Sequence, residues 1–247
     1  MTFPRRLHNL FLLCLLLLGS FPPAQADIDC DGVDDLLTTG LLLSAFVTDS
    51  TFSVTTWVKV QSTPATGTNC YEGSVLTGEA YGVLSLGRRA PTTFCVEAYD
   101  ASSRHLSGTA SPGWHHLAVT AGGGLLTFYV DGIVSETDGL TALSDLTAPV
   151  TLCGIPSGFT ADRLADVRYC PTALPAAEIL LMAASRQRGI GRTPASAAWP
   201  LDDCAHGSSG DGISFKDRSG NNRHATGTNG GGTCRGSEYL MRTGWVQ

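Results

Sequence analysis

Carboxylate, hydroxyl and amide side chains gather in one turn near the end of the chain. Asp217, Ser219, Asn221 and Asn222 surround a single glycine. Their oxygen atoms are hard ligands of the kind that Ca²⁺ prefers, so the turn predicts a calcium site. The same residue types form Asx turns, in which the side chain accepts hydrogen bonds from nearby backbone and no metal is bound. Both interpretations stay open.

A second acidic stretch, DIDCDGVDD, places five aspartates around Gly32 at residues 27–35. Acidic residues at alternate positions before a glycine are typical of the start of a calcium loop. The bidentate acid that such a loop needs at its twelfth position falls on Thr38 instead. The calcium-loop pattern is therefore incomplete.

Three tyrosines, Tyr71, Tyr81 and Tyr99, lie near the edges of expected loops. An exposed ring there could stack on the apolar face of a sugar at a small entropy cost. Each ring could instead be half-buried in a strand. We select these three residues as candidates for ligand binding.

The elements that must position these residues are strands. In the segment WHHLAVTAGGGLLTFYVDGIVSE, residues 114–136, apolar and polar residues alternate with a period of two. A glycine cluster and then Asp131-Gly132 separate the runs, and both are strong signals for tight reversals. Further short apolar runs between turn residues follow the same pattern, and an apolar stripe from about Pro175 to Arg188 predicts one helix. We therefore expect an all-β fold, a two-sheet antiparallel sandwich with one short helix after the last core strands.

Five motifs resemble the laminin-G-like, concanavalin A-like jelly-roll family. They are CDGVDDLL at residues 30–37, FSVTTWVKV at 52–60, the hairpin WHHLAVT with LTFYVDG, DVRY followed by TAL and AAEI at 166–179, and WPLDD followed later by DRSGNN. The resemblance implies a jelly roll over residues 27–247 and favours a strand entry at residues 30–37 over a calcium loop, although both interpretations stay open. The last motif opens the domain in many members, so we expect the C-terminal strands to pair near the N-terminal strand. We also expect Trp57, Phe128 and Trp199 in the core, and Asp166 with Arg168 as a structural polar pair.

Glucan hydrolases share this architecture, and the resemblance implies that such enzymes carry two glutamates and an aspartate on one strand face. The nearest approach here is Glu136-Thr137-Asp138, which Leu140 and Thr141 follow, so the third acid is missing. His115 and His116 are neighbours on one strand and should point to opposite faces, which argues against joint chemistry. We expect no catalytic activity.

The start of the chain has the features of a secretion signal. Arg5 and Arg6 precede an apolar run, and Ala24-Gln25-Ala26 offers a signal-peptidase site, so we expect residues 1–26 to be a signal peptide. Its removal takes away two positive charges and lowers the formal net charge from −6 to −8. An acidic chain of this kind makes nucleic acid an improbable partner.

Seven cysteines would remain in the exported chain. In an oxidising compartment an odd number predicts three disulfides and one free thiol. We favour pairs of cysteines that lie on either side of a polar loop containing glycine, because a disulfide that closes such a loop reduces the entropy of the unfolded chain. The expected pairs are Cys204 with Cys234, Cys70 with Cys95 and Cys153 with Cys170, which leaves Cys30 as the odd thiol.

The sequence predicts a secreted or extracellular binding domain without catalysis, with carbohydrate, assisted by calcium, as the first choice because the family resemblance implies it. A cell-surface or periplasmic location stays open. The alternative is a structural or adhesive module that contacts other proteins. No membrane insertion is expected after signal cleavage, and the sequence names neither the ligand nor the oligomeric state.

Overall fold

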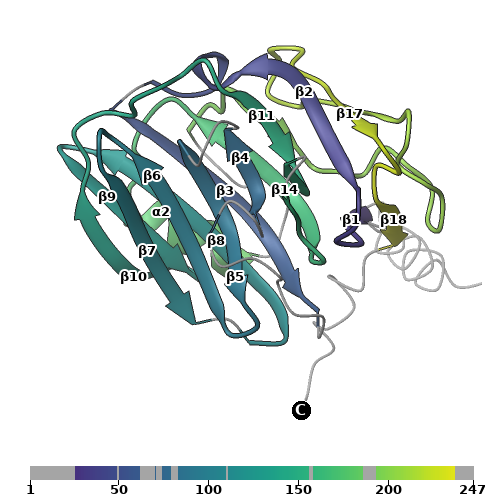
Figure 1. The fold of residues 1–247 in the computed structure, drawn as a ribbon, viewed down its shortest axis with the longest axis horizontal. Coiled ribbons are helices and arrows are strands. Elements are labelled where there is room, and N and C mark those ends of the chain that lie inside the picture. The colour runs from purple at the N-terminus through teal and green to yellow at the C-terminus, as the bar shows by residue number, and fades with distance from the viewer. Residues whose placement is uncertain are drawn as a thin grey trace, which may run out of the picture.

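A computed structural model describes residues 26–48, 50–61, 70, 74–78, 83–109, 111–155, 158–185 and 193–236. The chain forms two stacked antiparallel sheets (Figure 1). This arrangement confirms the all-β sandwich that the strand patterns predict.

The first sheet has strands in the spatial order β10 (Ile133–Gly139), β9 (Leu125–Val130), β8 (Gly113–Gly122), β3 (Phe52–Val60), β14 (Arg163–Cys170), β1 (Ala26–Asp29) and β18 (Thr233–Gly236), and β15 (Ala197–Trp199) also pairs with β14. The second sheet has the order β16 (Ser214–Phe215), β17 (Ala225–Thr228), β2 (Leu36–Leu42), β11 (Pro149–Leu152), β4 (Ser74–Gly78), β5 (Leu84–Ala90), β6 (Thr93–Tyr99) and β7 (Ser103–Thr109). A short ribbon joins β12 (Gly154–Ile155) to β13 (Gly158–Phe159), and a 3-10 turn, η1, spans Leu43–Ala45.

The hairpin of β8 and β9 forms as its alternating sequence predicts. Leu117 pairs with Val130 and Val119 with Phe128, and all these side chains pack between the sheets. Gly123 and Gly124 have φ of 63° and 81°, and the next reversal has Asp131 at 53° and Gly132 at 82°. Positive φ at both central residues is the geometry that makes Asp-Gly a hairpin turn.

The core between the sheets is aliphatic with an aromatic centre. Phe46 lies 5.3 Å from Tyr169 and 5.6 Å from Trp199, measured between ring centroids. Phe128 and Trp199 are fully buried there, as expected. Trp57 is also buried, as expected, but it packs in a smaller hydrophobic cluster with Ala165 and Trp114, apart from the main core. Its position in β3 turns it to the opposite face from Val58, which does face the core.

The helix α2 (Ala176–Ser185) lies on the outer face of the first sheet, where Ile179 and Met182 pack with Ala118 and Tyr129. This helix lies within the expected range of about Pro175 to Arg188, of which residues 186–188 lie outside the described residues. Among the described residues, none of the helices is both long and apolar enough to cross a membrane.

The C-terminal strands return to the N-terminal ones. β17 pairs with β2, and β18 pairs with β1 (Figure 1). This confirms the pairing that the order of the last motif predicts.

Three disulfides link Cys70 with Cys95, Cys204 with Cys234 and Cys30 with Cys153. The first two are the expected pairs. The third corrects the expected Cys153–Cys170 pair and the assignment of Cys30 as the free thiol. Cys153 packs in the core between the sheets, whereas Cys170 is free and lies under α2 on the outer face of the first sheet. Burial raises the pKa of the Cys170 thiol to about 11, so little thiolate forms near neutral pH.

Candidate ligand-binding and cation-binding sites

The turn around Asp217 is held by hydrogen bonds to that carboxylate. Oδ1 accepts from the backbone N–H of Ala198 (2.9 Å) and Ser219 (2.8 Å), and Oδ2 accepts from the Ser219 hydroxyl (2.8 Å) and the Arg223 N–H (3.0 Å). Burial alone would raise the pKa of Asp217, but these hydrogen bonds lower it. Protein donors therefore already occupy the oxygen lone pairs that a cation would need.

The two amides of this turn are also arranged for structure. Asn221 Nδ2 donates to the carbonyl oxygens of Ser196 (3.0 Å) and Ala195 (3.3 Å), and Asn222 has a positive φ of 57°. The turn thus has the geometry of the Asx-turn alternative, and the four residues selected as calcium ligands fit a cation poorly.

The acidic stretch at residues 27–35 divides into two parts. Asp27 and Asp29 extend from β1 and make ion pairs, Asp27 with Arg163 at 2.7 and 2.8 Å and Asp29 with Arg235 at 2.9 Å. Thr38, the twelfth position, lies in β2. The spacing of a calcium loop is therefore not preserved in space, because the first two aspartates belong to a strand.

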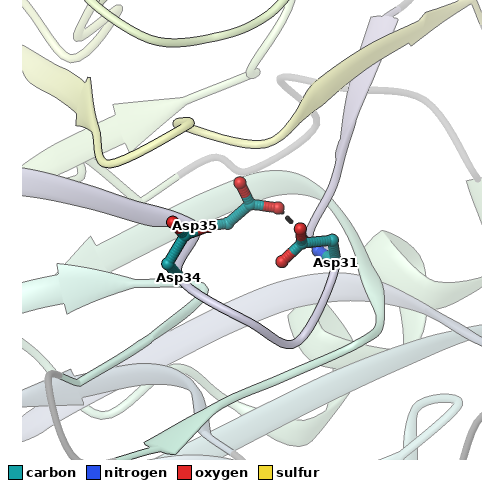
Figure 2. A group of neighbouring side chains, drawn as sticks. All are labelled: Asp31, Asp34 and Asp35. Atoms are coloured by element: carbon teal, nitrogen blue, oxygen red, sulfur yellow. Dashed lines mark hydrogen bonds between the residues drawn. The ribbon is translucent and has the colours of Figure 1, made fainter.

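The remaining three aspartates form what we call the acidic loop, Asp31, Asp34 and Asp35 (Figure 2). One carboxylate oxygen from each lies within 4.8 Å of the others. Asp35 accepts hydrogen bonds from the N–H groups of Asp31 (2.6 Å) and Gly232 (2.9 Å). Burial, together with the charge of Asp31, raises the pKa of Asp35. Three convergent carboxylates repel one another unless a cation or a proton compensates them, and their oxygens suit a hard cation such as Ca²⁺.

Of the three selected tyrosines, Tyr71 and Tyr81 lie outside the described residues. Tyr99 ends β6 with 39% of its surface exposed and pairs with Ser103 of β7. Glu97 lies two residues before Tyr99 and pairs with His105, and its carboxylate is 4.0 Å from His105 Nδ1. Residues two apart on a strand share a face, as do residues paired across two strands. The exposed Tyr99 ring and the exposed His105 imidazole therefore occupy one patch, which we call the Tyr99 patch, whereas the Glu97 side chain on the same face is buried.

The adjacent histidines point to opposite faces, as predicted. His116 is buried beside the Trp57 ring, and burial lowers its pKa to about 4. His115 Nδ1 lies 2.8 Å from Asp131 Oδ2, and its Nε2 lies 3.0 Å from both the hydroxyl and the carbonyl oxygen of Ser111.

The distances in this chain of contacts resemble those of a Ser–His–Asp triad. The difference is that Nε2 also faces a carbonyl oxygen. The Ser111 carbonyl oxygen can only accept, so an Nε2 bonded to it must carry a proton. A nitrogen that carries a proton cannot act as the base for the neighbouring hydroxyl. With Nε2 protonated, His115 donates to the Ser111 carbonyl oxygen and ties the Ser111 loop to the β8–β9 hairpin through Asp131.

The two acids nearest to a glucanase pattern bridge the two sheets. Glu136 Oε2 accepts from the N–H (2.6 Å) and the hydroxyl (3.0 Å) of Ser107 in β7. Asp138 lies 3.8 Å from Arg104 of the same strand. Both carboxylates thus cover an edge strand, whose unpaired N–H groups would otherwise be open to another chain.

Two buried ion pairs give no signal in the sequence. Arg88 of β5 makes two hydrogen bonds to Asp162, and Arg163 makes two to Asp27. The partners are 74 and 136 residues apart, so no local pattern connects them. The predicted pair of Asp166 with Arg168 also forms, at 3.3 Å.

The outward surface of α2 is apolar. Its exposed residues are Ala176, Ala177, Leu180, Leu181 and Ala184. Exposed Val134 of β10 continues this surface, because it pairs with Tyr129, which packs under α2. We call these residues the α2 surface.

Comparison with known proteins gives one family and several structures. The family model described as the concanavalin A-like lectin/glucanases superfamily matches residues 31–180. No curated protein sequence matches this chain. A solved structure from Bacteroides ovatus, provisionally described as a carbohydrate binding protein, has 14% identity and a TM-score of 0.56, and the match covers 87% of this chain. The chain spans 60% of the length of that protein. The SAP-like pentraxin of Limulus polyphemus has 15% identity and a TM-score of 0.49, with 70% of this chain and 88% of that chain covered.

Proposed function

Because the chain belongs to the concanavalin A-like lectin/glucanase superfamily, we propose that it is a secreted domain that binds carbohydrate without cutting it. The observation that carries this proposal is the Tyr99 patch, which combines an exposed ring with the exposed His105 imidazole on one face of the sheet. The ring would offer a rigid platform to the apolar face of a pyranose, and the exposed His105 imidazole would direct hydrogen bonds to its hydroxyls. Tyr71 and Tyr81 complete the proposed contact set.

The proposal that the protein does not cleave carbohydrate rests on the contacts of two carboxylates among the described residues. A retaining glycosidase needs one carboxylic acid and one free carboxylate close together. Glu136 and Asp138 instead accept hydrogen bonds or pair with arginine at the edge of β7. A bound glycan would therefore dissociate without being cleaved.

Secretion is supported by the N-terminal pattern and by the three disulfides. Disulfides persist in oxidising compartments and are rare in reducing ones. In the proposal, residues 1–26 direct export and the remaining chain acts outside the cytoplasm.

Calcium is proposed as a cofactor, at the acidic loop and not at the Asp217 turn. Asp31, Asp34 and Asp35 would supply the ligand oxygens, and the bound charge would offset their mutual repulsion. The ion would stabilise this loop and the neighbouring Gly232 segment, which already bonds to Asp35.

The calcium assignment is tested by thermal melting in chelator and in excess calcium. Calcium should raise the melting temperature of the wild type, since a ligand that binds only the folded state stabilises it. Asp31→Asn combined with Asp34→Asn should remove that rise. Asp217→Asn should lower the melting temperature equally in both conditions, because it loses hydrogen bonds and no metal. An unchanged wild type would reject calcium and leave the carbohydrate proposal standing.

The carbohydrate assignment is tested on immobilised glycans with the purified exported protein. Tyr71→Ala, Tyr81→Ala and Tyr99→Ala together should abolish binding, because the stacking platform is gone. Leu181→Ala is the matched control, since it removes an exposed apolar side chain from α2. Unchanged binding by the triple variant would place the contact surface elsewhere.

A second candidate function, contact with other proteins, is favoured by the α2 surface. Exposed apolar surface without charge is common where proteins associate. In its simplest form the partner is another copy of this chain, and sedimentation at rising concentration would detect it. Leu180→Ser with Leu181→Ser should abolish such association while glycan binding persists.

A further inference from the structure

The turn between β17 and β18 carries an Asn-Gly pair, Asn229 and Gly230, in an exposed position. Asn229 has φ of 53° and Gly230 has φ of 98°, and the N–H of Gly231 donates to the carbonyl of Thr228 at 3.0 Å. Positive φ at both central residues makes this a type I′ turn. Within the described residues, no hydrogen bond engages the Asn229 side chain or the Gly230 N–H.

Asn-Gly is the pair in which backbone attack on the side-chain amide meets least hindrance, since glycine has no Cβ. The Gly230 nitrogen loses its proton to solvent and attacks Asn229 Cγ. The Cγ–N bond breaks, ammonia leaves, and a five-membered succinimide forms. Water then opens the ring at either carbonyl carbon, which gives aspartate or isoaspartate. The only co-reactant is water, so no enzyme or oxidant is needed.

The neighbours of the turn give this reaction a specific consequence. A Cβ on Gly230 would lie 2.8 Å from Asp35 Oδ1 and 3.6 Å from Asp34 Oδ1, so the Gly230 backbone lies directly against the acidic loop. The next glycines are closely packed: a Cβ on Gly231 would lie 2.6 Å from the Asp211 nitrogen. A carboxylate at position 229 would be carried one residue before this contact with the acidic loop, and isoaspartate would also lengthen the backbone directly before the closely packed Gly231.

We propose that Asn229 is a self-modifying site, at which spontaneous deamidation adds a fourth carboxylate beside the acidic loop. The modification converts a neutral turn into a negatively charged one without any partner. It goes beyond the proposed carbohydrate binding and does not depend on it. The folded turn slows the reaction, because the type I′ conformation must open before the Gly230 nitrogen can reach Cγ.

The reaction is tested on the full chain by incubation at mildly alkaline pH, followed by peptide mapping. The expected result is a gain of about 1 Da in the peptide that holds Asn229, with separate aspartate and isoaspartate products, and faster gain in urea. Asn229→Gln is the matched control, since a glutamine side chain cyclises far more slowly. Asn221 and Asn222, which no glycine follows, should stay unmodified. No mass gain at residue 229 in the folded protein, under conditions where the unfolded chain gains it, would overturn the proposal.

The effect of the added negative charge at residue 229 can be measured separately, by thermal melting. In the presence of chelator, Asn229→Asp should melt about 2 °C below Asn229→Gln at low salt, and the difference should shrink at high salt, because added ions screen exposed charges. A difference that salt does not change would show that the new carboxylate does not interact with the acidic loop. Neither measurement uses a glycan, so failure here leaves the proposed function untouched.

Discussion

The buried pair of Arg88 and Asp162 is the place where one substitution should cost most. The Arg88 side chain is 1% exposed, and it donates to both carboxylate oxygens of Asp162 at 2.9 and 2.8 Å. Arg88→Met keeps most of the apolar stem and removes the charge. The Asp162 carboxylate, 0% exposed, would then keep its hydrogen bonds from the Gln61 N–H and the Thr160 hydroxyl, both 3.3 Å, but lose its counter-charge.

Removing one partner of a buried ion pair costs about 3–5 kcal/mol, because the other charge stays in a medium that solvates it poorly. One kcal/mol shifts the melting temperature of a protein of this size by about 2–4 °C. Arg88→Met should therefore melt about 6–20 °C below the wild type. Arg88→Met with Asp162→Leu removes both charges and should recover most of the loss, since an apolar replacement of a buried pair is often neutral.

The assay is thermal unfolding followed by circular dichroism at neutral pH, with urea unfolding as a second measure. Arg218→Met is the control, because its pair with Asp203 is at the surface and such pairs contribute about 0–1 kcal/mol. If Arg88→Met melts within about 2 °C of the wild type, as the control should, the buried pair does not stabilise this fold and the reasoning is refuted.

Two further predictions concern His115 beside the β8–β9 hairpin and Gly227 in β17. The hydrogen bond to Asp131 raises the pKa of His115. The stability that the protonated His115–Asp131 pair adds is therefore complete below 6.5, the ordinary pKa of histidine, and is lost as pH rises through the raised pKa of the folded state. The difference in melting temperature between wild type and His115→Gln should close at alkaline pH, and a difference independent of pH would contradict this assignment. A Cβ on Gly227 would strike the Gly210 carbonyl, so Gly227→Ala should lower the free energy of unfolding by about 1–3 kcal/mol in urea titration. Gly139→Ala, whose Cβ would meet nothing closer than 4.0 Å, should differ little from wild type, and equal loss in both variants would show that close packing is not the cause.

Local patterns predict the strands and turns of this fold well. The alternation of Leu117, Val119 and Phe128 decides which side of each strand faces the core, because the side-chain period of two leaves no other choice. Asp131-Gly132 fixes its own turn through its backbone conformation. These features depend on residues close together in the chain, so the sequence alone contains the information.

Pairings that depend on the whole topology are not predictable in this way. Cys30 reaches Cys153 across 123 residues, and Arg88 reaches Asp162 across 74. The assignment of Cys170 to Cys153 fails because one faces the core and the other faces α2. No local spacing records which face of which sheet a distant residue will meet.

The candidate cation sites show a different limit, since the same side chains serve two purposes. Asp217 has the composition of a calcium ligand, but four donors from Ala198, Ser219 and Arg223 satisfy it. In the acidic loop, Asp34 and Asp35 approach Asp31 because the chain turns at Gly32, where φ is 78°. The amino-acid composition identifies both turns as candidate cation sites. Only the positions of the hydrogen-bond donors around each carboxylate show which turn has oxygens left for a cation.

The central claim, that this jelly roll binds carbohydrate and leaves it intact, is tested most directly on a broad array of glycans with the exported protein. The account predicts reproducible binding to one class of glycan, loss of that binding in the triple tyrosine variant, and no shortened product after long incubation with the bound glycan. Release of shorter sugars would contradict the non-catalytic assignment. Absence of binding to every glycan, with and without calcium, would contradict the carbohydrate assignment itself.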